Sequence, residues 1–249
     1  MELAIIAPPA MLELAGLVDS YHMVLPSFMD YADETYGNFY RDLSGYKILD
    51  NGTAEGKLYS AIRLHEMARS VGANCIIVHD KLGQTDLTIK LCRAFEKHHD
   101  DNMDYMGVIQ GKTLSEVLKC LYFYDNECPW ITTIGIPRIL CALHRTQRVT
   151  LAESIIDQQQ KGNLRDFKLH ALGASEWVNE ILLLKEAGVH GMDTSLPIVF
   201  GLEAVGLDHD YISRKSDFIG ADVDRSSIEW RYCFDNTVQL LRWAGQTLH

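Results

Sequence analysis

The sequence predicts a single (β/α)8 TIM barrel that forms one domain over residues 1–249, and three observations lead to this fold. Eight short apolar or β-branched runs recur along the chain, and each ends at a turn residue. Helix-like segments lie between the runs, and strands that alternate with helices indicate a parallel sheet. Eight such units in 249 residues match a closed barrel, and no long linker divides the chain.

The predicted strands share an apolar run followed by a turn. They are residues 1–9, 21–28, 46–52, 74–80, 105–111, 130–137, 167–173 and 189–195. The segment 10–20 is short for a helix. The segment 29–45 is acidic and tyrosine-rich, and we expect it to form a loop over the barrel mouth.

Helix signals follow several strands. Residues 55–72 place apolar side chains at a spacing near 3.6 and end at Gly72, which predicts an amphipathic helix. Thr85 is the predicted cap of the next helix, and Thr113 precedes Glu116 at the spacing of a capping box. Another helix is expected between Ser175 and Gly188, and a closing helix near the end of the chain.

Composition narrows the class of protein. The chain is 47% hydrophobic and 23% charged, as in ordinary globular proteins, and its apolar runs are far shorter than the ~18–20 residues of a membrane helix. The first residues lack the basic region of a signal peptide. Six scattered cysteines contain no CxxC, which disfavours a cysteine zinc site. We therefore expect a cytoplasmic protein with no membrane partner and no cofactor.

Polar residues mark the ends of several predicted strands. In barrels of this kind the chemistry lies at the carboxyl ends of the strands. Asp50, Asp80 and Gln110 follow each other at intervals of 30 residues, about one strand–helix unit, so they are expected on neighbouring strands. The other strand-end residues singled out are Gly111, Gly135, Ile136, Arg138, His170 and Asp193.

This residue set suits a purine. A carboxylate accepts the N–H groups of the base, and an amide donates to O6. A further carboxylate can attack the sugar C1′ while another group transfers protons. Each residue alone also has a structural explanation. Asp50 could form a turn, Asp80 could cap a helix, Gln110 could hold a loop and Asp193 could begin a helix, while His170 could be a buried strand histidine.

The order of these motifs resembles the tRNA-guanine transglycosylase superfamily over about residues 46–200. The segments that carry the resemblance are "ILDNGTAEG", "IIVHDKL", "YMGVIQGK", "TIGIPR" and "HGMDTSLP". The resemblance implies that Asp193 is the nucleophile and that Asp50 transfers protons. It also implies that the base is bound by Asp80, Gln110, Gly111, Gly135 and Ile136.

Differences between this sequence and the family's motifs indicate which branch of the family it resembles more. The cysteine and histidine spacing of the family's zinc site is absent, so we expect a barrel without a zinc-binding subdomain. The aromatic lid of the family falls near Ala54 and its stacking methionine near His170, so His170 or a tyrosine from 31–46 is expected to contact the base. The compact chain is more similar to the phage and bacterial 7-deazaguanine DNA transglycosylases. Similarity to that branch implies exchange of guanine in DNA for a free 7-deazaguanine base such as preQ0. If the enzyme is encoded by a phage, the resemblance implies that it acts in the host cytoplasm.

Binding of DNA has to overcome a formal charge of −11. We expect a basic barrel mouth with the acids elsewhere, and the candidate phosphate contacts are Lys112, Arg138, Arg145 and Arg148. A second basic cluster lies at 213–215. Alternatives are guanine exchange in tRNA, an inactive partner subunit, and a barrel hydrolase of small nucleosides. The sequence leaves open a homo-oligomer or an accessory protein.

Overall fold

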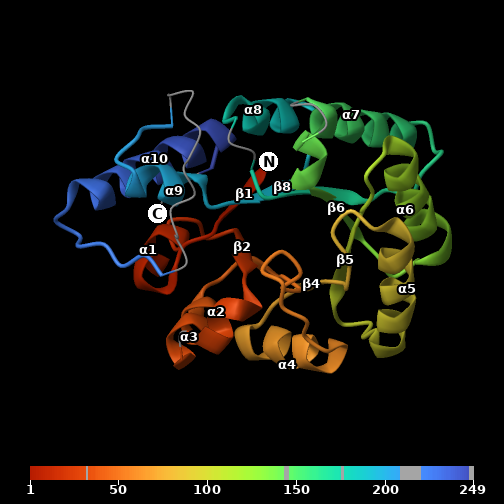
Figure 1. Cartoon of the computed structure of the whole chain (residues 1–249), viewed down its shortest axis with the longest axis horizontal. Coiled ribbons are helices and arrows are strands. Elements are labelled where there is room, and N and C mark those ends of the chain that lie inside the picture. The colour runs from red at the N-terminus through yellow and green to blue at the C-terminus, as the bar shows by residue number, and fades with distance from the viewer. Residues whose placement is uncertain (32, 143–145, 175–176, 208–219, 247–249) are drawn as a thin grey trace.

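The computed structural model describes residues 1–31, 33–142, 146–174, 177–207 and 220–246 (Figure 1). Within these residues eight parallel strands form one sheet in the order β1-β8-β7-β6-β5-β4-β3-β2. The end strands β1 and β2 lie beside each other, so the sheet is a nearly closed barrel and the predicted TIM barrel is confirmed. The strands are β1 Glu2–Ile5, β2 Tyr21–Val24, β3 Tyr46–Leu49, β4 Cys75–Ile77, β5 Asp104–Val108, β6 Thr133–Pro137, β7 Lys168–Leu172 and β8 Gly191–Thr194.

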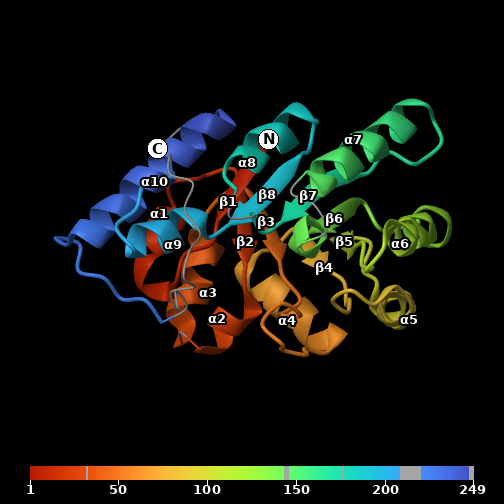
Figure 2. The ribbon, with the colours of Figure 1, turned by 45° about the horizontal axis from the view of Figure 1, so that its top comes forward.

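Helices connect the strands and surround the barrel (Figure 2). The α-helices are α1 Leu12–Ala15, α2 Pro26–Tyr31, α3 Asp33–Asp42, α4 Ala61–Val71, α5 Thr85–Phe95, α6 Leu114–Glu127, α7 Gln147–Gln160, α8 Asn179–Glu186, α9 Leu196–Leu202 and α10 Ile228–Ala244. Three 3-10 turns are η1 Pro9–Met11, η2 Glu96–His98 and η3 Arg138–Ala142. No helix among the described residues is long and apolar enough to cross a bilayer.

Two of the predicted helix ends are observed, and the predicted cap at Thr85 is not. Gly72 ends α4 in a left-handed conformation, and Thr113 with Glu116 forms the predicted capping box of α6. Thr85, however, is the first residue of α5 rather than its cap. Its hydroxyl donates instead to the carbonyl oxygen of Gln110 at 2.6 Å. This bond ties α5 to the end of β5, beside the predicted site.

The segment 29–45 is not a loop over the mouth. It forms the end of α2 and all of α3, the helical connection that follows β2. Tyr36 and Tyr40 are each 1% exposed, and the Tyr36 hydroxyl accepts a hydrogen bond from the Leu25 amide. The aromatic residues that suggested a lid therefore form an apolar helix face packed on the barrel.

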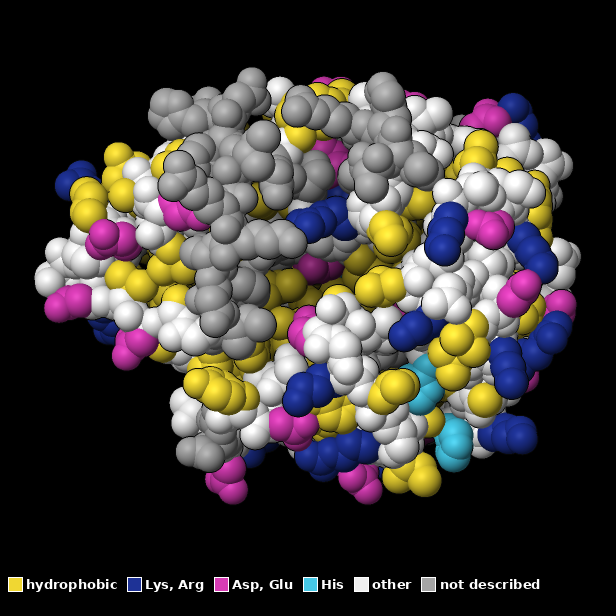
Figure 3. Space-filling model, viewed as in Figure 1, with side chains coloured by type: hydrophobic (Ala, Val, Ile, Leu, Met, Phe, Trp, Pro, Cys, Tyr) yellow, Lys and Arg dark blue, Asp and Glu magenta, His cyan; other side chains and the backbone are white. Residues whose placement is uncertain are grey.

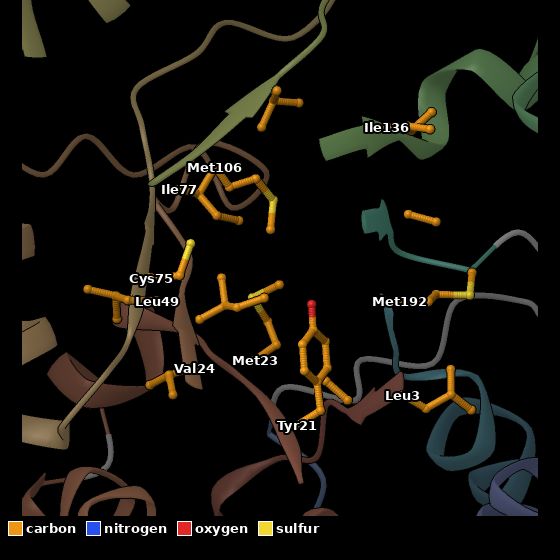
Figure 4. Packing of buried hydrophobic residues seen from close by; sticks show 14 of the residues in the cluster. Leu3, Tyr21, Met23, Val24, Leu49, Cys75, Ile77, Met106, Ile136 and Met192 are labelled. Atoms are coloured by element: carbon orange, nitrogen blue, oxygen red, sulfur yellow. The ribbon is translucent and has the colours of Figure 1, made fainter. Parts of the chain in front are cut away.

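Buried side chains fill the inside of the barrel (Figure 4). Tyr21 of β2 points its ring between Met23 and Met192, with its hydroxyl in the interior (Figure 4). Gly191 of β8 leaves room for this ring, because a Cβ atom there would lie 2.5 Å from the Tyr21 hydroxyl oxygen. The interior is thus packed around a tyrosine as well as aliphatic residues.

The last helices close the outer layer. Gly201 of α9 packs against α10, and a Cβ at this position would clash with the Cys233 amide nitrogen. Cys233 is fully buried, and the closing helix α10 is capped by Ser227 and ends at Gly245. This pair of helices covers the barrel where β8 and β1 meet (Figure 2).

Candidate active site

A cavity of about 810 Å³ opens at the carboxyl ends of the strands. Its polar lining includes Asp50, Glu55, Asp80, Gln110, Arg138 and Asp193. Its apolar lining includes Met23, Leu25, Ile77, Leu82, Val108, Ile139 and Leu172. A hollow with acidic side chains inside it and hydrophobic and Lys or Arg side chains at its edge is visible in Figure 3. The cavity has room for a flat heterocycle with its sugar, between aliphatic walls.

Asp193 is held by one of its two carboxylate oxygens. It is the third residue of β8 and is 5% exposed. Its Oδ1 accepts hydrogen bonds from the Gly173 amide at 3.1 Å and from His170 Nε2 at 2.9 Å. Among the described residues none donates to Oδ2, and Asp193 lines the cavity. One oxygen is therefore anchored, while the other is available to a ligand.

His170 is in turn held by Tyr21. The Tyr21 hydroxyl lies 2.7 Å from His170 Nδ1, and the two side chains are 3% and 0% exposed. Burial raises the pKa of Tyr21 well above its usual value, so the phenol keeps its proton and can donate to Nδ1. With Nδ1 as acceptor, a neutral His170 carries its proton on Nε2 and donates it to Asp193. The chain from Tyr21 to Asp193 thus assigns the histidine tautomer.

Asp50 and Glu55 come from the loop after β3. Burial raises the pKa of Asp50 well above its usual value, with Glu55 as the next cause and Asp193 as a further one. Burial also raises the pKa of Glu55, whose Oε2 is buried without a partner in the described part of the chain. Asp50 is therefore stabilised as a neutral acid, which can donate a proton to a ligand.

Asp80 belongs to a network of amide groups. Its Oδ1 accepts from Asn51 Nδ2 at 2.8 Å and its Oδ2 accepts from Gln110 Nε2. Gln110 Oε1 accepts from the Gly83 amide at 2.9 Å. Burial raises the pKa of Asp80, whereas the bonds from Asn51 and Gln110 oppose this rise. The carboxylate keeps unused lone pairs, and the Gln110 amide keeps one N–H, for a ligand in the cavity.

Asp50 and Asp80 do not have the structural roles that the sequence allowed, whereas Gln110 does. Asn51, rather than Asp50, makes the turn after β3, since its Oδ1 accepts from the Thr53 amide at 2.8 Å. Asp80 bonds to Asn51 and Gln110 and does not cap α5. Gln110 does hold the loop of Gly83, so its structural role is present alongside its position in the cavity.

Three predicted base contacts lie outside the cavity lining. Gly135 and Ile136 are buried in β6, and the cavity is instead lined by the residues that follow, Pro137, Arg138 and Ile139. Gly111 is buried against α6, where a Cβ atom would lie 2.7 Å from the Val117 amide nitrogen. This glycine serves helix packing. A base in this cavity would therefore not contact the backbone of Gly111, Gly135 or Ile136.

The predictions for His170 and Arg148 are corrected. His170 is completely buried below Asp193, so it supports that carboxylate and does not contact a base. Arg148 is 0% exposed and forms a bidentate ion pair with Glu180, which links α7 to α8 and excludes it from phosphate binding. The prediction that Arg148 belongs to a basic cluster on the surface is therefore wrong.

The other predicted cations lie near the mouth. Lys112 and Arg138 are exposed at the ends of β5 and β6, and Arg138 also lines the cavity. Arg145 and the cluster at 213–215 lie outside the described residues. The acidic run 98–104 precedes β5 and so lies at the opposite end of the barrel. The mouth itself is not free of acids, because Asp50, Glu55, Asp80 and Asp193 line its cavity, and the expectation that the acids lie elsewhere is wrong for these four.

Sequence reasoning missed Glu55 and Tyr21. Glu55 lies five residues after Asp50 in a loop long enough to fold back over the mouth, and this spacing is the sequence feature that indicates it. Tyr21 begins its strand, and only the closed barrel brings it to His170, 149 positions away. Among the described residues no three His, Cys, Asp or Glu side chains group as a metal site.

Comparisons of the sequence with known protein families and curated proteins found no match. No family model matches the sequence, and no curated protein sequence matches it significantly.

Proposed function

We propose that this protein exchanges guanine in DNA for a 7-deazaguanine base such as preQ0, through a covalent bond between Asp193 and the sugar. The observation that supports the proposal best is the pair of unlike carboxyl groups in one cavity. Asp193 has an anchored and an available oxygen, and Asp50 has a raised pKa. One nucleophilic carboxylate and one neutral acid are what double displacement at C1′ requires.

In the first step Asp193 Oδ2 attacks C1′ and forms a C1′–O bond. The C1′–N9 bond breaks, its electron pair passes to N9, and Asp50 gives its proton to the departing guanine. In the second step N9 of the incoming base attacks C1′, the C1′–O bond breaks and Asp193 becomes a carboxylate again. Asp50 takes the N9 proton, so each cycle returns both residues to their starting states.

The Asp80 network supports recognition of the base. Its carboxylate can accept from the ring N1–H and the 2-amino group, and the remaining N–H of Gln110 can donate to O6. The network is buried, so a base that lacks these groups would leave polar atoms without partners. Such sites discriminate strongly between ligands.

The test is incorporation of labelled guanine or preQ0 into DNA, compared with tRNA. We expect label in DNA, with none for Asp193→Asn and a strongly reduced rate for Asp50→Asn. Asp101→Asn is the matched control, because this acid is 95% exposed at the other end of the barrel. Its rate should equal that of the unchanged protein.

A covalent intermediate gives an independent readout. Denaturation during turnover should leave DNA attached to the protein, and Asp193→Asn should abolish this species. Label in tRNA alone would replace DNA by RNA as substrate. Release of guanine from free deoxyguanosine without exchange would replace the proposal by a nucleoside hydrolase.

A further inference from the structure

The loops after β3, β4, β5 and β6 share an arrangement around the cavity. Each has an exposed cation next to, or one residue from, an exposed aliphatic side chain. The pairs are Lys57 with Leu58, Lys81 with Leu82, Lys112 with Leu114, and Arg138 with Ile139. The four aliphatic side chains are 85%, 45%, 49% and 44% exposed, in that order. We call these eight residues the rim.

The rim is continuous around part of the mouth. A Cβ atom at Gly83, next to Leu82, would lie 3.6 Å from Lys112 Cγ and 3.9 Å from Ile139 Cδ1. The loops after β4, β5 and β6 therefore meet. Lys57 approaches the site from β3, since its Cβ lies 3.1 Å from a Cβ placed on Gly52. Leu82, Arg138 and Ile139 also line the cavity.

The rim cations differ from most of the basic residues on the helices. Arg63, Arg93, Lys119 and Lys161 form ion pairs with nearby acids. Across the described ranges, no ion pair involves Lys57, Lys81, Lys112 or Arg138. In a chain with a formal charge of −11, these four exposed cations stand at the edge of a mouth whose acids, Asp50, Glu55, Asp80 and Asp193, line the cavity inside it. The edge of the mouth is therefore the part that can attract an anionic partner.

On the basis of the proposed function, we infer that the rim is a docking surface for duplex DNA. The lysines contact phosphates, and the aliphatic side chains enter the groove or the base stack beside the target guanine. Apolar side chains that insert between bases unstack them, and the target base has to leave the helix to reach Asp193. An anionic bilayer would also attract the rim cations. It has no base, however, that could bind the carboxyl and amide groups of the cavity that the rim surrounds.

The test measures binding of a short fluorescent duplex over a range of salt concentrations. The variant carries Lys57→Gln, Lys81→Gln and Lys112→Gln. The control carries Lys90→Gln, Lys97→Gln and Lys161→Gln, which remove the same charge from exposed helical positions and helix ends. We expect the rim variant to bind about tenfold more weakly or worse. Its log–log salt slope should fall by about 0.9 for each phosphate that is no longer neutralised. The control should keep most of its affinity.

The aliphatic part of the rim has its own test. Leu58→Ser with Leu114→Ser should reduce the fluorescence increase of a 2-aminopurine that unstacks in the duplex, whereas Leu182→Ser on α8 should not. Equal affinity and equal salt slope for the rim variant and the unchanged protein would overturn the inference. Rim-dependent binding of tRNA, or of phosphatidylserine vesicles, without duplex binding would also overturn it.

Titration with free guanine separates this inference from the proposed function. Guanine binding that is unchanged in the rim variant, together with weakened duplex binding, supports both. Rim-dependent duplex binding by a protein that neither binds guanine nor exchanges it would leave the docking surface in place and remove the proposed reaction.

Discussion

Replacement of Tyr21 by phenylalanine tests the chain that orients Asp193. The change removes one hydroxyl and keeps the ring that fills the barrel, so it creates almost no cavity. It deletes the 2.7 Å bond to His170 and leaves the buried Nδ1 without a donor. An unsatisfied buried acceptor costs about 1–3 kcal/mol. For a chain of this size a loss of ~2 kcal/mol lowers the unfolding temperature by roughly 4–8 °C.

The matched control is Tyr46→Phe. The Tyr46 hydroxyl also makes a 2.7 Å bond, to Asp104 Oδ2, and Tyr46 stacks on Tyr21 with ring centroids 5.9 Å apart. It does not bond to His170 and is less buried, so water can replace its hydroxyl. We expect a smaller loss of stability and no change at His170.

Two measurements decide the outcome. Thermal unfolding gives the stability change, and nitrogen-15 spectra of the His170 ring report which nitrogen is protonated and whether Nδ1 accepts a hydrogen bond. In base exchange, Tyr21→Phe should lower kcat about 10-fold or more and leave the KM for the free base unchanged, by analogy with second-sphere partners of histidine. An unchanged unfolding temperature together with an unchanged ring spectrum would refute the hydrogen-bond chain.

Substitutions at Asp50, Arg148, Thr113 and Thr85 also have defined outcomes. The pKa of Asp50 is raised in the folded protein, so Asp50 destabilises the folded state when it has to ionise there. This destabilisation is absent below the pKa of the unfolded chain and grows as the pH rises toward the folded pKa. Asp50→Asn should therefore raise the unfolding temperature more at pH 8 than at pH 4. Arg148→Met breaks the buried ion pair with Glu180 and should cost ~3–5 kcal/mol in chemical denaturation. Adding Glu180→Leu should recover only part of this loss, because Arg148 also donates to the carbonyl oxygens of Leu172 and Gly173. Thr113→Ala removes the capping box of α6 and should cost ~1 kcal/mol, whereas Thr85→Ala should instead loosen the contact between α5 and Gln110.

Part of the candidate site follows from local sequence. Asp50, Asp80, Gln110 and Asp193 come together because the carboxyl ends of parallel strands meet at one mouth, and strand ends are visible as apolar runs that stop at turn residues. A different argument, from a basic cluster in the sequence, failed for Arg148. A helix that faces a neighbouring helix on one side can bury a cation with an acid, and a basic sequence cluster does not tell which side its members face.

The order of strands and helices was predictable from the amino-acid sequence, and with it the barrel and the end at which its acids gather. These features follow from hydrophobic periodicity and turn residues, which act over a few neighbouring positions. The folded barrel was needed to show which Asp193 oxygen is available, that Tyr21 assigns the His170 tautomer, and that Glu55 joins Asp50. Such relations depend on distances of a few ångströms between residues that lie far apart in the chain until the barrel closes.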